Sequence, residues 1–146
     1  MDFTTAPLPE RVNRSERRWV YGFATAVMLL TLLPYLIGFS VQGDDFRFTG
    51  FVIAVEDGNS YIAKMLSGMS GAWLFRSPYS AMPQAGVVMY LPYILLGKLA
   101  AAPGAHEQLL ALYQLFRLAA GFLSILASYD FLAFFIREIR LRRFGL

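Results

Sequence analysis

A run of 25 residues without a charged side chain, at 19–43, constrains this chain more than any other feature. A transmembrane helix needs about 20 consecutive apolar residues. The run supplies them, and Trp19 and Tyr21 at its start are suited to anchor it at the interface. It is too long for the apolar part of a cleaved signal peptide and lacks a clear cleavage site of small residues. We therefore predict an uncleaved first transmembrane helix at 19–43.

The composition agrees with a membrane protein. Of 146 residues, 57% are hydrophobic and 16% are charged, whereas soluble domains contain about 25% charged residues. Further apolar runs occupy 85–102 and 109–136. The sequence thus predicts an all-α integral membrane protein with about three hydrophobic helices and an external loop containing short juxtamembrane helices. Because the chain has no cysteine and His106 is its single histidine, thiolate sites and multi-histidine metal sites are excluded.

The positive charge is concentrated in two basic tails, 1–18 and 137–146. Arginines beside a transmembrane helix mark the cytoplasmic side, so the N-terminus is predicted to be cytoplasmic and the loop 44–84 external. A net charge of only +3, placed at the ends, argues against a nucleic-acid partner. Three crossings would put the tail 137–146 outside. Two crossings would put it inside, and 85–102 would then be re-entrant or lie along the interface; the sequence leaves both arrangements open.

Arg117 and Asp130 interrupt the apolar run 109–136. Thirteen residues apart on one helix, they are separated by about 20 Å and cannot pair with each other. Each is therefore expected either near a membrane face or directed into the protein interior. The acidic pair Asp44-Asp45, directly after the first apolar run, is predicted to form an interfacial turn.

The external loop contains the stretch Glu-Asp-Gly-Asn-Ser-Tyr. On a helix, Asp57, Tyr61 and Lys64 would share one face and present a carboxylate, a phenol and an ammonium group. Such a trio suits binding of a sugar or phosphate while the carboxylate moves a proton. Spacing alone favours a solvated helix start with Asp57 or Asn59 as its N-cap. Glu56 would point away from Asp57, so the two need not act as a pair.

The order of features in this loop resembles the N-terminal part of the GT-C superfamily of membrane glycosyltransferases, which includes protein mannosyltransferases and aminoarabinose transferases. The similar elements are Asp57-Gly-Asn-Ser-Tyr61-Ile-Ala63, Gly71-Ala72-Trp73 and Tyr113-Gln-Leu-Phe-Arg117. This chain departs from the family pattern at Gly58, where a glutamate is common, and at Met82-Pro83-Gln84, where a Lys-Pro-Pro-like element is common. The resemblance favours three crossings.

The resemblance implies transfer of a sugar from a polyprenyl-phosphate carrier to an acceptor at the outer face of a bacterial or archaeal plasma membrane. Asp57 would be the catalytic base, Glu56 an assisting group and Tyr61 a positioning residue, while Lys64 or Arg76 would meet a lipid phosphate. No cofactor is required, a divalent cation is a candidate, and its ligands are unassigned. The implied partners are membrane lipids, the lipid-linked donor and further transmembrane helices of the same or another chain. Because such enzymes carry many more helices, this chain is expected to be an N-terminal portion.

The alternative is a small non-enzymatic membrane subunit or scaffold whose loop only turns the chain. The small residues Ala119-Ala120-Gly121 and Gly68-x-x-Gly71 would then support helix packing. Whether the chain belongs to an enzyme therefore stays open on its sequence.

Overall fold

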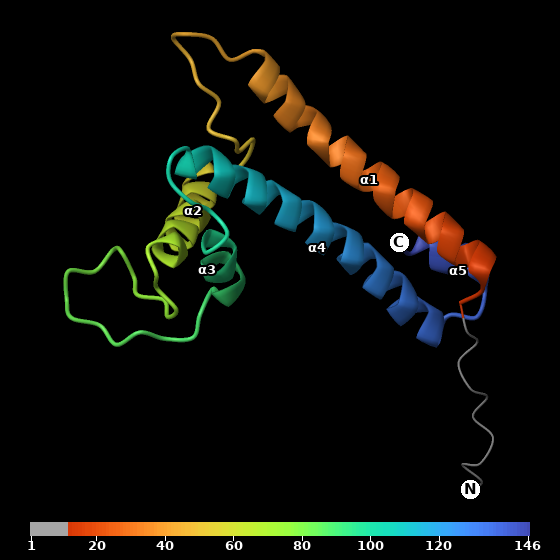
Figure 1. The fold of residues 1–146 in the computed structure, drawn as a ribbon. Helices are drawn as coiled ribbons and strands as arrows, with labels where there is room; N and C mark the ends of the chain where they lie inside the picture. The colour runs from red at the N-terminus through yellow and green to blue at the C-terminus, as the bar shows by residue number, and fades with distance from the viewer. Residues whose placement is uncertain (1–11) are drawn as a thin grey trace, which may run out of the picture. The chain divides into compact units, whose positions relative to one another are not determined.

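The computed structural model describes residues 12–146, so most of the predicted tail 1–18 lies outside the described residues. The regular elements of the described range are helices: α1 (Arg14–Ser40), α2 (Val55–Met69), α3 (Leu91–Gly97), α4 (Ala105–Phe135) and α5 (Ile139–Phe144) (Figure 1). An isolated antiparallel bridge between Phe75 and Val87 lies in the loop from α2 to α3. The predicted all-α class is confirmed for this range.

Two helices, α1 and α4, are long and apolar enough to cross a membrane. The third hydrophobic helix, predicted at 85–102, is not confirmed, because this segment forms only the seven residues of α3. Seven residues span about 10 Å, whereas the hydrocarbon core is about 30 Å thick. The local cause is the backbone: Tyr90 adopts a left-handed conformation with φ 54°, and Pro92 follows in the first turn. A helix cannot continue through this point.

The chain forms two compact units, which we describe separately. Unit 1 consists of the residues up to Leu33 together with Leu118–Leu146, and unit 2 is Pro34–Arg117. Unit 1 therefore contains the first part of α1, the second part of α4, and α5. Unit 2 contains α2 and α3, and its ends are the last turns of α1 and the first turns of α4.

In unit 1, α1 and α4 run antiparallel, as Figure 1 shows. Arg17 near the start of α1 pairs with Asp130 near the end of α4 at 3.0 Å. Further along α1, Met28 lies against Gly121 of α4. The Asp130 carboxylate is thus neutralised by Arg17, beside the first turn of α1 and close to the end of the apolar segment.

A buried polar cluster joins α1, α4 and α5 at this end of unit 1. Glu16 Oε1 accepts a hydrogen bond of 2.9 Å from the Tyr129 hydroxyl and one of 3.0 Å from Arg142 Nη1. All three residues are buried, and Arg142 Nε also donates to the Ile136 carbonyl. Buried charges are tolerated when they are paired and hydrogen-bonded, so this cluster fixes α5 against the start of α1.

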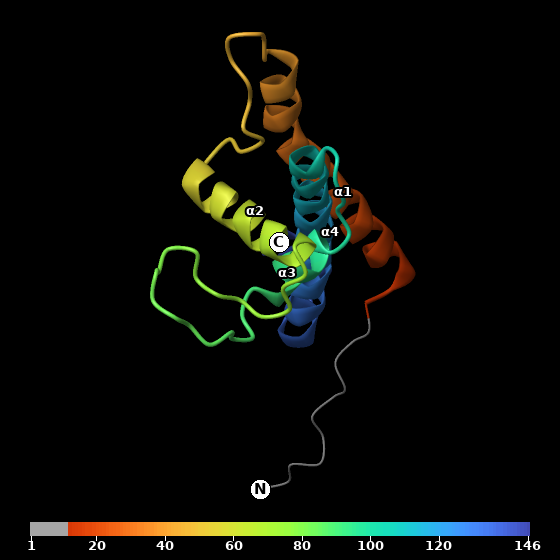
Figure 2. The same cartoon turned by 60° about the vertical axis from the view of Figure 1, so that its left-hand side comes forward.

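In unit 2, α2 packs closely against α3, and Figures 1 and 2 both show the two helices side by side. Gly68 of α2 faces the backbone carbonyl of Ile94, and Gly97 of α3 faces the carbonyl of Met65. A Cβ atom at either glycine would overlap the opposite carbonyl. The buried residues around this contact form a hydrophobic core of Phe51, Ile62, Met65, Ala100, Leu109 and Leu110.

We predict that Gly68→Ala or Gly97→Ala destabilises unit 2, because each added methyl group must push the two helix backbones apart. The expected loss is about 1–3 kcal/mol, typical of overpacking, measured as a lower midpoint of thermal unfolding in detergent. Gly22→Ala is the matched control, since nothing lies within 4 Å of a Cβ at this glycine of α1. Equal midpoints for all three variants would contradict the close contact.

Candidate functional site

The two acidic residues of the predicted motif, Glu56 and Asp57, are exposed in the first turn of α2. The expectation that Asp57 or Asn59 caps this helix is wrong. The helix begins earlier: Ala54, in a left-handed conformation with φ 52°, is the N-cap, and its carbonyl accepts the Gly58 N–H at 2.9 Å. Asp57 therefore lies inside the first turn, where the helix dipole favours a carboxylate.

Tyr61 faces the interior of unit 2, where tyrosines from three helices stack. Its ring centroid lies 4.6 Å from that of Tyr93 of α3 and 6.0 Å from that of Tyr113 of α4. Phe51 meets Tyr113 edge to face at 5.3 Å. Burial, with a smaller contribution from the nearby Tyr61, raises the pKa of Tyr93. The hydroxyl of Tyr93 thus stays protonated at neutral pH, and the stack ties α2, α3 and α4 together within unit 2.

Lys64 is buried, and its ammonium group is enclosed by its own helix and by aromatic rings. Nζ donates a hydrogen bond of 2.6 Å to Ser60 Oγ and one of 3.3 Å to the Ser60 carbonyl. It lies 4.3 Å from the ring centroid of Tyr90 and 4.9 Å from that of Tyr61, both cation–π distances. The predicted face of Asp57, Tyr61 and Lys64 is therefore not one exposed polar surface: the first is exposed, the second half-buried and the third buried.

Arg76, the second predicted phosphate-binding residue, is exposed and has different surroundings. It lines a hollow of about 490 Å³ beyond the C-terminal half of α2. Ser67 and Ser70 also line this hollow, with their hydroxyl groups donating hydrogen bonds to carbonyls of α2, whereas Lys64 does not line it. The two cations therefore have different surroundings: Arg76 is open to solvent, and Lys64 packs among aromatic residues.

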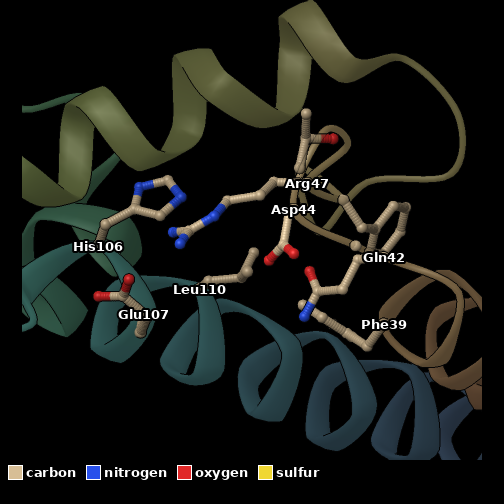
Figure 3. Close-up of a pocket in the computed structure, with 10 residues that line it drawn as sticks. Phe39, Gln42, Asp44, Arg47, His106, Glu107 and Leu110 are labelled. Carbon is tan, nitrogen blue, oxygen red and sulfur yellow. The ribbon is translucent and has the colours of Figure 1, made fainter.

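A second hollow, of about 620 Å³, is built from the loop after α1 and the first turns of α4 (Figure 3). Its polar side chains carry two carboxylates, a guanidinium, an imidazole and an amide, and two aromatic rings complete the lining. These residues are Asp44, Glu107, Arg47, His106, Gln42, Phe39 and Phe48. A concave site with several hydrogen-bonding groups and apolar walls is the usual form of a ligand pocket. Asp44, predicted as part of an interfacial turn, thus belongs to a hollow.

A site for a divalent cation needs several oxygen or nitrogen ligands that converge on one point. Within residues 12–146, no group of three or more carboxylate or histidine side chains is arranged to hold a metal ion. In the second hollow, the positively charged Arg47 stands among the carboxylates. This mixture is better suited to hydrogen-bonding a polar ligand than to binding a cation.

Sequence reasoning did not find the hollow or the tyrosine stack. Pro103 and Gly104 directly precede α4, so the local sequence does indicate that His106 lies in the first turn of this helix. Nothing in the sequence, however, indicates that Arg47 lies in the same hollow as His106. Tyr93 was also missed, because its partners come from helices that are distant in the sequence.

We predict that Tyr61 acts through its ring. Tyr61→Phe should keep the thermal unfolding midpoint of the chain in detergent, because the stacking with Tyr93 remains. Tyr61→Ala should lower the stability by about 2 kcal/mol, through lost apolar burial and aromatic contact. A large loss in Tyr61→Phe would instead show that the hydroxyl makes the important contact.

In comparisons with protein-family models, with curated proteins and with solved structures, nothing matches this chain.

Proposed function

We propose that this chain is the N-terminal portion of a membrane glycosyltransferase that takes its sugar from a polyprenyl-phosphate carrier. The observation that carries the proposal is the placement of Asp57. Its carboxylate is exposed in the first turn of α2, a helix that packs closely against α3. The resemblance of the loop to the first external loop of GT-C enzymes supports the same reading. Further transmembrane helices, from the same or another chain, would complete the walls of the active site.

The packing of α2 supports a catalytic role for its first turn. The glycine contacts of Gly68 and Gly97 and the ring of Tyr61 fix the helix against α3. A catalytic group must be held within a fraction of an ångström of its productive position. In this chain a rigid helix would provide that positioning for Asp57, with Tyr61 as a residue of the support.

In the proposed reaction, the Asp57 carboxylate accepts the proton of the acceptor nucleophile. The freed electron pair of the nucleophile attacks the anomeric carbon, and the bond from that carbon to the carrier phosphate oxygen breaks. The phosphate leaves with the bonding electrons, and the anomeric centre is inverted. General base catalysis of this kind contributes about 10²–10⁴-fold to a rate. Glu56, exposed next to Asp57, would assist by adding negative charge.

The two hollows of unit 2 offer groups for the remaining parts of the substrates. The exposed Arg76, beside Ser67 and Ser70, is the better candidate for the lipid phosphate, because the Lys64 ammonium group is enclosed. The hollow around Arg47 and His106 carries donors and acceptors suited to sugar hydroxyls. A requirement for a divalent cation would appear as loss of transfer in a chelator.

We predict that Asp57→Asn lowers sugar transfer by about 10²-fold or more without lowering the amount of protein in the membrane. The measurement is transfer of radiolabelled sugar from polyprenyl-phosphate-linked donors in membranes of the native host, normalised to the chain by immunoblot. Glu56→Gln is the matched control, since it removes a neighbouring exposed carboxylate and should cost less than tenfold. Transfer by Asp57→Asn at the wild-type rate would refute the catalytic role of this residue.

The second candidate function is a non-enzymatic membrane subunit. It is favoured by the many apolar side chains that α1 and α4 leave exposed, which suit contact with lipid or with partner helices. These include Leu29, Leu30, Leu36, Ile37, Leu115, Leu123, Phe131, Phe134 and Phe135. On this reading, Asp57→Asn behaves as wild type, while removal of the whole chain lowers the amount of its partner in the membrane.

A further inference from the structure

Two arginine-rich segments from opposite ends of the chain meet in unit 1. Arg142 of α5 pairs with Glu16 of α1 at 3.0 Å, and both side chains are buried. The guanidinium of the next residue, Arg143, lies 4.8 Å from the ring centroid of Trp19. These contacts hold the C-terminal segment against the first turns of α1.

The arginines left exposed by these contacts gather at the same end of unit 1. Arg17 and Arg142 are each paired with a carboxylate, and in the described part of unit 1 Glu138 is the exposed carboxylate that remains. The exposed arginines are Arg14, Arg18, Arg137 and Arg140. We call these four residues, together with Arg143, the basic face.

Both α1 and α4 are long and apolar enough to cross a membrane, and their parts in unit 1 form an antiparallel hairpin (Figure 1). From Trp19 to Leu33, α1 has no charged residue. The part of α4 in unit 1 has one, Asp130, which is paired with Arg17. The uncharged part of α1, Trp19–Ser40, measures about 33 Å at 1.5 Å per residue, which is enough to span a hydrocarbon core of about 30 Å. Because the two helices are antiparallel, both ends of the hairpin reach the same membrane surface.

We infer that the basic face binds the anionic headgroups of phospholipids at the cytoplasmic surface. Clusters of four to eight basic residues next to a membrane helix attract acidic lipids, and each arginine contributes about fivefold at low salt. This placement satisfies the preference for cytoplasmic arginines at both ends of the chain with two crossings. The inference does not depend on the proposed enzymatic function.

The first test measures lipid selectivity at Trp19 in the full chain carrying Trp73→Phe, which removes the other tryptophan. Trp19 fluorescence is measured in two kinds of vesicle, one with brominated phosphatidylglycerol and plain phosphatidylcholine and one with the bromine on phosphatidylcholine instead. Comparing the quenching in the two gives the relative association of each lipid with the protein near Trp19. We expect a preference for phosphatidylglycerol, which falls about tenfold or more in Arg14→Gln/Arg18→Gln/Arg140→Gln. Raising the salt should weaken the preference in the parent protein.

The matched pair is Arg140→Gln, which removes one positive charge from the basic face and should lower the preference about fivefold, and Lys98→Gln, which removes one positive charge from unit 2 and should leave the preference unchanged. An unselective parent protein, or a basic-face variant that keeps full selectivity, overturns the proposal. Tight binding of RNA by the basic face without any lipid preference would also overturn it, because the partner would then be a different polyanion.

The second test locates the two ends, using the absence of native cysteine. Ser15→Cys and Phe144→Cys are placed in the full chain, with Tyr79→Cys in the α2–α3 loop as the opposite-side control. Phe144 is 92% exposed and Tyr79 is 80% exposed. In oriented membrane vesicles, an impermeant maleimide should label positions 15 and 144 from one side and position 79 from the other. Labelling of 144 together with 79 overturns the proposal.

Discussion

The carboxylate of Glu16 is the contact on which unit 1 depends. One oxygen accepts the Asn13 N–H at 2.9 Å, while the Asn13 side chain accepts the Glu16 N–H at 2.9 Å, so α1 begins with a reciprocal cap. The other oxygen holds the Tyr129 hydroxyl and the Arg142 guanidinium. Removing one partner of a buried ion pair leaves an uncompensated charge, at a cost of about 3–5 kcal/mol. The start of α1, the end of α4 and α5 are therefore stabilised or lost together.

Unit 2 is organised by a different kind of contact. Two glycines let the backbones of α2 and α3 touch, and stacked tyrosines join them to the first part of α4 within the unit. Neither contact involves a formal charge, so the acidic first turn of α2 is not needed to hold the fold. The two predicted phosphate-binding residues differ in the same way. Lys64 is part of the packing, whereas Arg76 remains available at the surface.

Long apolar runs predicted α1 and α4 correctly, because hydropathy over about 20 residues is a local property. The same measure overestimated 85–102, where the left-handed backbone of Tyr90 delays the start of the helix to Leu91 without changing the hydropathy. Asp57 is exposed, as expected for a residue at a solvated helix start. By contrast, Glu16 binds Tyr129 and Arg142, which lie more than 100 residues away, and His106 shares its hollow with residues of another loop. No local pattern encodes such contacts.

The distance along the chain between Glu16 and Arg142 has a consequence for biosynthesis. The two residues are 126 positions apart, so α1 leaves the ribosome long before its partner in the C-terminal segment exists. Until then the Glu16 carboxylate must remain in contact with water, which keeps the start of α1 at the membrane surface. The contacts described for unit 2 join residues of Pro34–Arg117 and involve no residue after Arg117. The segment between α1 and α4 can thus fold during translation, and the end of the hairpin that contains Glu16 and Arg142 closes last.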